Sequence, residues 1–305
     1  MNNEITVFAP AKINLFLEVT GKRADGYHNI ATLFAKIAIG DNIKIAAEKA
    51  AQTSIELKVK GPYGEALKGD KTNLVYKAAA AFFEHFDIKA KCAVRLEKNI
   101  PLASGLGGGS SDAAAVIMVL CALFNKETNA KRMKDLVKLT AKLGADVPFF
   151  LYPETFYKGE GIGSELTPIK NHTISPWIVV AYPNIKSDTK EAYQCLKLNG
   201  QDKILTNLSN LNKLISSIEE GNPTGDWRSL VYNKLEDCVL GRLQPVAALK
   251  ADLIKLGADT ALMSGSGSCV FGLVKEKAKA EEIAKEIGKD GGRTVFLTHF
   301  WRSKV

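Results

Sequence analysis

The stretch PLASGLGGGSSDAAAVIMVLCALFN, residues 101–125, constrains the fold more than any other part of the chain. Four glycines and three serines fall within the eight residues 104–111, and an apolar segment follows at once. Because glycine is entropically costly to order, a cluster of glycines indicates a backbone that must approach something closely. We therefore expect a binding loop that runs into a helix over residues 111–124.

This glycine-rich loop is suited to phosphate groups. Glycines allow consecutive backbone N–H groups to point inward, and Ser110 and Ser111 lie at the predicted helix start, where unpaired N–H groups and the helix dipole attract anions. No lysine follows the glycines, which excludes a P-loop, and Ser110 stands at the third glycine position of a dinucleotide fingerprint. Protein kinases place their glycines on a hairpin. A flexible loop, or a close helix packing through glycine, remains the alternative interpretation.

The first half of the chain mixes strands and helices. Alternating β-branched and aromatic residues predict strands, and an asparagine before an apolar segment predicts a helix start. The expected elements are a strand pair or bent strand over 4–20 around Pro10, strands within 33–60, a helix capped by Asn73, a strand over 91–98, the helix over 111–124, and a helix capped by Asn129 that ends before Gly144.

The second half begins with a strand over 176–184 and the helix that TKEAYQCLK opens. Three helical stretches follow between about 209 and 256, then two strands joined by a small-residue turn, a charged helix over about 276–288 and a last strand. This is the β-α-β-β-α-β order of a ferredoxin-like unit with inserted helices. We place the domain boundary near residue 160, which predicts an α+β protein with domains 1–160 and 161–305.

The composition is that of an ordinary globular protein, with 305 residues, 46% apolar and 24% charged. No apolar segment is long enough to cross a bilayer, and the N-terminus lacks the pattern of a secretory signal, so we expect a cytoplasmic protein without a membrane partner. The net charge of +8 is compatible with a polyanionic ligand. The lysines are spread over many helices, however, so nucleic acid is not expected as a partner.

Cysteine and histidine give no metal pattern. The five cysteines, Cys92, Cys121, Cys195, Cys238 and Cys269, are widely spaced and include no C-x-x-C pair. Most of them are expected to be small buried hydrophobic residues in a reducing compartment. The four histidines, His28, His85, His172 and His299, lack metal-ligand spacing, so no zinc site is expected.

Four segments resemble motifs of the GHMP small-molecule kinases, and they occur in the order of that superfamily. PLASGLGGGSSDAAA resembles its nucleotide-binding signature, and PAKINLFLEVTGKRADGYHNI looks like the N-terminal signature of one branch. LGADVPFFL and LMSGSGSCVFGL match its two later motifs. Two departures stand out: GSGSC replaces the usual G-T-G-A-C, and YPNIKSDT replaces H-P-G-x-x-x-x-T.

The resemblance implies a ribosomal-protein-S5-like N-terminal domain that binds ATP and a ferredoxin-like C-terminal domain that binds substrate. The branch with ADGYH implies ATP-dependent phosphorylation of the 2-hydroxyl of a cytidine-diphosphate-linked methylerythritol, in the non-mevalonate isoprenoid pathway. The expected partner is thus a small molecule, and the expected state is a monomer or weak homodimer. Another GHMP kinase, for homoserine or mevalonate, or an inactive S5-like binding module, remains an alternative.

The resemblance also implies site residues. Lys12 and Asp146 correspond to a catalytic pair, in which Asp146 accepts or orients the proton of the substrate hydroxyl and Lys12 steadies charge. Alone, Lys12 would be interpreted as a surface lysine and Asp146 as a helix cap. Mg²⁺ is expected to bridge the phosphates of ATP, with its protein ligands left open. The residues expected to wrap the nucleotide are Pro101, Leu102, Ala103, Ser104, Gly105, Leu106, Gly107, Gly108, Gly109, Ser110 and Ser111.

Cytosine recognition is expected from aromatic residues, because a flat base stacks on aromatic faces. Tyr27 and Tyr193 would clasp the ring, and His28 would contact its edge. Asn14 and Thr189 would hold the methylerythritol end. The Gly265–Gly267 turn would close the site near the substrate phosphates; an ordinary hairpin turn is the alternative.

Overall fold

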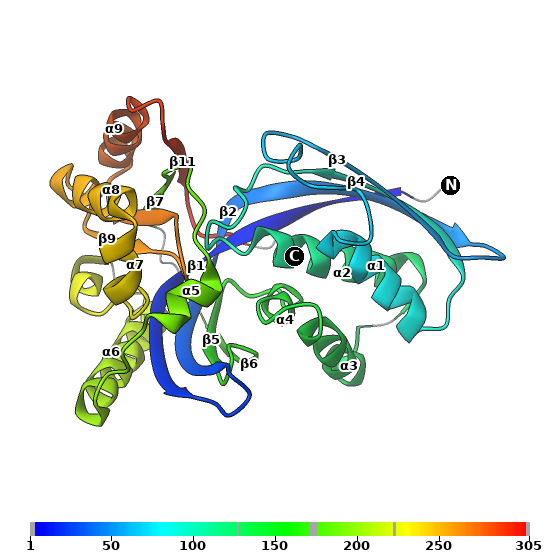
Figure 1. The fold of residues 1–305 in the computed structure, drawn as a ribbon, viewed down its shortest axis with the longest axis horizontal. Coiled ribbons are helices and arrows are strands. Elements are labelled where there is room, and N and C mark those ends of the chain that lie inside the picture. The colour runs from blue at the N-terminus through cyan, green and yellow to red at the C-terminus, as the bar shows by residue number, and fades with distance from the viewer. Residues whose placement is uncertain (1–3, 127, 171–175, 222–223, 303–305) are drawn as a thin grey trace. The chain divides into compact units, whose positions relative to one another are not determined.

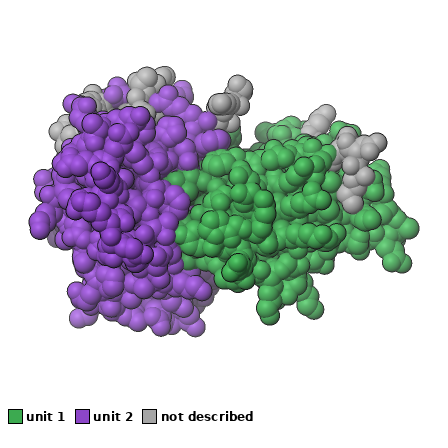
Figure 2. All heavy atoms as spheres, turned by 90° about the horizontal axis from the view of Figure 1, so that it is seen from above, with its two compact units in different colours: residues 1–11, 39–102, 107–153 green, residues 12–38, 103–106, 154–305 purple. Residues whose placement is uncertain are grey.

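The structure is a computed structural model that describes residues 4–126, 128–170, 176–221 and 224–302 (Figure 1). These residues form two compact units (Figure 2). Unit 1 comprises residues 1–11, 39–102 and 107–153, and unit 2 comprises residues 12–38, 103–106 and 154–305. This division is not a single boundary near residue 160, because two early segments, residues 12–38 and 103–106, belong to the same unit as the C-terminal half. The division into domains 1–160 and 161–305 stays a prediction.

The sheet of unit 1 is built from the strands predicted there. The long strands β1 (Glu4–Lys22) and β2 (His28–Lys49) each contribute one end to this unit. Residues Asn42–Lys49 of β2 pair antiparallel with β4 (Ala90–Glu97), which pairs in parallel with β3 (Ser54–Lys60). β1 continues through Pro10 as one strand, so the alternative of a strand pair over this segment is wrong.

Helices cover this sheet, and two of their starts are as predicted. Asn73 accepts a hydrogen bond from the backbone N–H of Val75, and Asn129 accepts one from Arg132, both at 3.0 Å. One helix ends earlier than predicted, with its C-cap at Lys142 and not at Gly144. Apolar side chains from all of these elements form one core. The helices are α1 (Leu74–His85), α2 (Gly108–Leu123), α3 (Ala130–Ala141) and α4 (Val147–Phe150).

Unit 2 contains three strands that the sequence analysis did not predict. β5 (Phe156–Glu160) pairs antiparallel with residues Thr32–Ala35 of β2 and with β6 (Glu165–Ile169). The two-residue strand β8 (Tyr232–Asn233) lies parallel to β1. β5 and β6 are short and carry Gly159 and Pro168, which weaken a strand pattern in the sequence.

The second sheet of unit 2 confirms the ferredoxin-like order. Its four strands lie in the order β11-β7-β10-β9, and every neighbouring pair is antiparallel. The helices α8 and α9 share the apolar core of this sheet. The strands are β7 (Trp177–Tyr182), β9 (Thr260–Met263), β10 (Val270–Val274) and β11 (Thr294–Thr298). The helices are α5 (Thr189–Gln194), α6 (Gln201–Glu219), α7 (Glu236–Arg242), α8 (Gln244–Lys255) and α9 (Lys277–Gly288), with a 3₁₀ helix over Thr224–Ser229.

Candidate active site

Within unit 2, the first part of the glycine-rich loop is bonded to the turn between β9 and β10. The hydroxyl of Ser264 donates to the carbonyl oxygen of Gly105 at 2.9 Å, and the backbone N–H of Cys269 donates to Ser104 at 3.0 Å. Gly105 has φ +80°, and a Cβ there would overlap the carbonyl oxygen of Ser264. Glycine is therefore required at this position for two backbone segments to meet.

Lys12 lies in the same part of unit 2. Its backbone N–H donates to the carbonyl oxygen of Leu106 at 2.9 Å, and its ammonium group donates to Asn14 Oδ1 at 2.5 Å. Asn14 in turn donates to Thr32 Oγ1 at 2.8 Å, and the side chain of Lys12 is only 4% exposed. Lys12 and Asn14 are two residues apart in β1, so their side chains share one side of the strand. The ammonium group is thus held in a fixed, buried position.

The β9–β10 turn reaches this lysine through glycine. Gly265 has φ +53°, and a Cβ on it would lie 3.2 Å from Lys12 Nζ and 3.1 Å from Asn14 Oδ1. The side chain of Asn233 fixes the same turn, since its amide donates to the carbonyl oxygen of Gly265 at 2.7 Å. The structure therefore brings Lys12, Asn14 and Gly265 together within unit 2.

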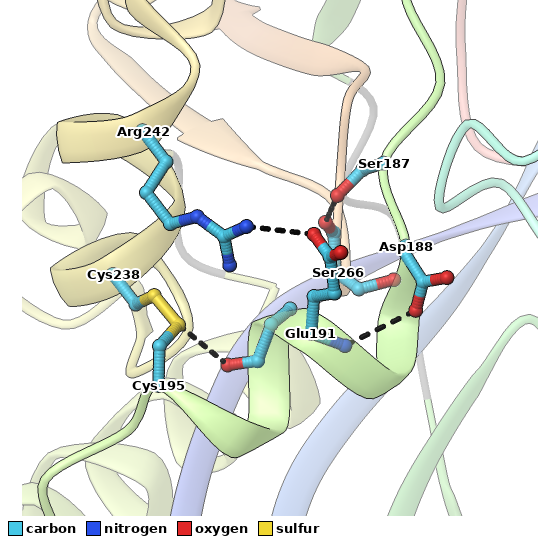
Figure 3. The surroundings of a disulfide bond; sticks show 8 residues. Ser187, Asp188, Glu191, Cys195, Cys238, Arg242 and Ser266 are labelled. Atoms are coloured by element: carbon cyan, nitrogen blue, oxygen red, sulfur yellow. Dashed lines mark hydrogen bonds and ion pairs between the residues drawn. A yellow bond between two sulfur atoms is a disulfide. The ribbon is translucent and has the colours of Figure 1, made fainter.

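The segment 182–188, in which the chain departs from the family pattern, is also tied to this turn (Figure 3). Ser187 Oγ donates to the carbonyl oxygen of Ser266 at 2.6 Å, and the hydroxyls of Thr189 and Ser266 lie 2.8 Å apart. Asp188 caps α5 by accepting from the backbone N–H of Glu191 at 3.1 Å. Thr189 is exposed at the first position of α5, as a ligand-binding hydroxyl requires.

Two of the three predicted aromatic residues lie together. The rings of His28 and Tyr193 stack with centroids 5.2 Å apart and an interplanar angle of 27°. Tyr27 is 62% exposed on a turn that Gly26 makes with φ +87°. Burial, and then the charge of Lys22, lower the pKa of His28, which favours the neutral imidazole that stacks well. The pairing of Tyr27 with Tyr193 across a base stays a prediction.

The second part of the glycine-rich loop belongs to unit 1. Gly107, with φ +69°, is the N-cap of α2, and the helix begins at Gly108, three residues before the predicted start at Ser111. The prediction of that boundary was wrong because the glycines themselves adopt helical geometry after a left-handed cap. Gly109 is exposed and Ser111 is buried in the first turn. The free N–H groups of that turn remain those expected to face an anion.

Asp146 occupies the N-cap position of the short helix α4, and its side chain accepts no hydrogen bond from the α4 backbone. Asp146 thus stands at a helix N-cap, as the alternative interpretation expects, but does not cap the helix through its side chain. Its loop lies beside the glycine-rich loop, since a Cβ on Gly144 would lie 4.0 Å from Ser110 Oγ. Asp146 is in unit 1 and Lys12 is in unit 2, and their action as a pair stays a prediction.

Several residues of this region were missed by the sequence analysis. Ser187, Ser264 and Ser266 lie in segments that the resemblance singled out, but nothing in the sequence indicated that their hydroxyls hold the loop and α5. Lys98 and Asp112 form a buried ion pair next to the glycine-rich loop. Lys98 lies three residues before Pro101. Its position between a strand and the glycine-rich loop was the only feature of the sequence that could have indicated a role for it near the loop.

The cysteines need one correction. Cys92, Cys121 and Cys269 are buried thiols as expected, and burial raises the pKa of each. Cys195 and Cys238 instead form a disulfide that joins the end of α5 to α7, with Cα atoms 6.0 Å apart (Figure 3). Arg242 and Glu191 connect the same helices by an ion pair of 2.7 Å. The sequence did not indicate the disulfide, because Cys195 and Cys238 are 43 residues apart in the chain.

The residues that the structure describes contain no cluster of three or more His, Cys, Asp or Glu side chains able to hold a metal ion. His172 lies outside the described residues. None of the described helices combines the length and the hydropathy needed to span a bilayer.

Comparison with known proteins gives the family. The family models for the GHMP kinases N terminal domain and GHMP kinases C terminal match residues 73–154 and 204–293. A 4-diphosphocytidyl-2-C-methyl-D-erythritol kinase of Clostridium botulinum (strain Loch Maree / Type A3) is 38% identical over 290 residues, covering 95% of this chain and 98% of that relative. The kinase of the same name from Bacillus cereus (strain B4264) is 37% identical over 280 residues, covering 92% and 91%.

Solved structures agree. A crystal structure of 4-(cytidine 5'-diphospho)-2C-methyl-D-erythritol kinase superposes with a TM-score of 0.77 at 29% identity, covering 98% of this chain and all of that one. A homoserine kinase from Cytophaga hutchinsonii shares the fold, with a TM-score of 0.76 at 19% identity, covering 98% and 95%. The chain therefore belongs to the GHMP kinases, in the family of the 4-diphosphocytidyl-2-C-methyl-D-erythritol kinases.

Proposed function

We propose that this chain transfers the γ-phosphoryl group of ATP to the 2-hydroxyl of 4-diphosphocytidyl-2-C-methyl-D-erythritol, giving the 2-phosphate and ADP. The observation that carries the proposal is the placement of Lys12 and Asn14 against the Gly265 turn, in a chain of this family. A buried, fixed ammonium group beside two glycine-rich turns suits a reaction that moves a charged phosphoryl group.

The proposed chemistry needs a group that takes a proton and a group that stabilises charge. Asp146 accepts or orients the proton of the substrate 2-hydroxyl, so that its oxygen can attack the γ-phosphorus. Lys12 stabilises the charge on the transferring phosphoryl group. Asn14 holds the Lys12 ammonium by the 2.5 Å hydrogen bond, so the position of that charge does not depend on the substrate.

The proposed nucleotide site is the loop 101–111. The backbone N–H groups of Gly107 to Ser110, at the start of α2, bind the phosphate oxygens of ATP. When bound with the nucleotide, Mg²⁺ would neutralise charge on the phosphates.

The proposed substrate site uses the aromatic residues and α5. Tyr27 and Tyr193 provide faces on which cytosine stacks, and His28 contacts its edge. Thr189 and Asn14 bind the methylerythritol end. The stacked contact between His28 and Tyr193 supports this proposal, because it places two of the three aromatic side chains in one cluster.

We also infer the setting of the reaction. A reaction that consumes ATP fits the cytoplasm, and the substrate is a small molecule, without a nucleic-acid or membrane partner. A monomer or weak homodimer is the proposed state. In a reducing compartment the Cys195–Cys238 bond would be open in part of the population.

The test is a coupled assay of ADP formation with ATP and the cytidyl substrate, run beside homoserine and mevalonate. We expect turnover with the cytidyl substrate alone. Asp146→Asn should reduce kcat by at least about a hundredfold while the protein stays folded. Asp87→Asn, an exposed acid-to-amide change in the same unit, is the control. Near-normal turnover of Asp146→Asn would remove Asp146 from the mechanism, and turnover of homoserine or mevalonate in its place would overturn the substrate assignment.

A further inference from the structure

A buried cluster of three charged side chains lies beside the start of α2. Lys98 donates to Asp41 Oδ2 and, at 2.6 Å, to Asp112 Oδ2. The side chains of Lys98, Asp41 and Asp112 are 1%, 0% and 2% exposed. We refer to these three residues as the Lys98 cluster. The reaction proposed above does not use it, so its burial needs another explanation.

The cluster joins three separate segments of unit 1. Asp41 on β2 accepts from the backbone N–H groups of Asn99 and Ile100, at 2.5 and 2.9 Å. Asp112 belongs to α2, just after the serine pair. The cluster therefore connects a central strand, the segment leading into the glycine-rich loop and the helix that leaves it.

Gly108 allows the cluster to reach the loop. A Cβ on Gly108, the first residue of α2, would lie 2.9 Å from Lys98 Nζ and 2.8 Å from Ile100 Cγ2. These distances are shorter than ordinary van der Waals contacts, so a side chain at this position would push the ammonium group away. The ammonium group of Lys98 thus lies directly against the first residue of the helix.

The pKa shifts in the cluster indicate that one of its two carboxyl groups, that of Asp112, holds a proton, which leaves one positive and one negative charge. Burial raises the pKa of Asp112 to about 8, against the opposing effect of Lys98 and with the support of Asp41. Burial alone would lower the pKa of Lys98, but Asp112 and Asp41 outweigh it and raise that pKa. Asp112 Oδ1 has no hydrogen-bond partner among the described residues. Near pH 7 these directions favour a charged Lys98 and an uncharged Asp112.

Stability by itself does not account for such a cluster. Buried ion pairs are often matched or exceeded in stability by apolar residues of the same volume. What an apolar cluster cannot supply is directional bonding that fixes the rotation and height of a helix start. A helix start displaced by a fraction of an ångström would point its N–H groups away from an anion.

We propose that the Lys98 cluster is a positioning device for the nucleotide: it holds the first turn of α2 so that the backbone N–H groups of Gly107 to Ser110 face the phosphates of ATP. This inference rests on the proposed assignment of that loop to ATP. Lys98 and Asp112 are positioning residues, since they act through the backbone of α2.

The main test uses Asp112→Ala, which removes the oxygen that accepts from Lys98 and leaves a residue that favours the helix. We expect the Kd of ATP, measured by calorimetry without the second substrate, to rise about tenfold. The KM of the cytidyl substrate and kcat at saturating ATP should change less than about twofold. Lys98→Met should act in the same direction, and Asp112→Ala keeps the test decisive if Lys98→Met does not fold. Asp87→Asn, which changes an exposed carboxyl just after α1, is the control.

A structural readout separates this inference from the proposed function. In nucleotide-free protein, the backbone amides of residues 111–114, the first of α2 that donate within the helix, should exchange with deuterium faster in Asp112→Ala than in the wild type, while α3 should be unchanged. If the wild type binds no ATP, the proposed function fails and the inference about ATP fails with it, whereas faster exchange would still show that the cluster holds the helix start. A folded Asp112→Ala with wild-type ATP affinity would overturn the inference. So would an equal loss for both substrates, because it would indicate a structural role without preference for the nucleotide.

Discussion

The hydroxyl of Ser264 donates a 2.9 Å hydrogen bond to the carbonyl oxygen of Gly105, a residue 159 positions earlier in the chain. This bond joins the first part of the glycine-rich loop to the β9–β10 turn, whose next residue, Gly265, lies against Lys12. A change in one loop should therefore affect both.

Gly105→Ala is expected to disrupt this junction. The left-handed φ of +80° and the overlap of a Cβ with Ser264 both oppose the substitution. We expect the free energy of unfolding to fall by about 1–3 kcal/mol, and the KM for ATP to rise, as measured by chemical denaturation and steady-state kinetics. Gly241→Ala is the control, since nothing lies within 4 Å of a Cβ there and alanine favours the helix α7. An unaltered KM in Gly105→Ala would separate this loop from the nucleotide.

Substitutions in the stacked pair of His28 and Tyr193 should reduce affinity for the cytidyl substrate and not for ATP. Replacing Tyr27 or Tyr193 by alanine should weaken binding of that substrate by about 1–3 kcal/mol for each stacking side chain lost. His28→Ala should weaken the same binding by removing the contact with the cytosine edge. ATP affinity should stay nearly constant. Calorimetry with each ligand measures both, and His85→Ala, an exposed histidine at the end of α1, is the control. Equal losses for the two ligands would argue for a damaged fold and against a cytosine site.

The raised pKa of Asp112 predicts a specific pH dependence of stability. Its pKa is 3.8 in the absence of perturbation and about 8 in the folded protein, so the folded state holds a proton that the unfolded state releases. The stabilisation from this proton is complete below pH 3.8 and is lost as the pH rises towards 8. Lys98 and Asp41 are the charged groups that face Asp112 in the cluster.

Urea denaturation at pH 5, 6, 7 and 8 should show this effect. The wild type is expected to lose stability with rising pH relative to Asp112→Asn, which has no proton to release. Asp87→Asn provides a comparison for an exposed carboxyl in the same unit. Parallel curves for the wild type and Asp112→Asn would contradict a protonated Asp112.

Reduction of the Cys195–Cys238 disulfide should loosen α5. The bond closes a segment with a sequence separation of 43 residues, and α5 carries both Thr189 and Tyr193. A thiol reductant should lower the free energy of unfolding by about 2–4 kcal/mol and raise the KM of the cytidyl substrate more than that of ATP. The double variant Cys195→Ser, Cys238→Ser should resemble the reduced protein and should not respond to the reductant. A response of that variant would place the effect elsewhere.

Local signals in the sequence were sufficient for many elements. Asn73 and Asn129 cap their helices as predicted, because the capping residue and the apolar segment are adjacent in the chain. The β-α-β-β-α-β order of the second half also follows from patterns of single elements, and the sheet order β11-β7-β10-β9 agrees with it. The short strands β5 and β6 were missed because Gly159 and Pro168 interrupt their pattern and distant pairing stabilises them.

The sequence by itself determined that a glycine-rich loop enters a helix and that Lys12 and Asn14 share one side of a strand, since both depend on residues a few positions apart. Only the tertiary structure decided that Ser264 bonds to Gly105, that Asp41 and Asp112 share Lys98, and that Cys195 meets Cys238. Each of these contacts joins residues from different elements of the fold. Spacing along the chain does not predict such contacts, because they depend on how whole strands and helices pack around a common core.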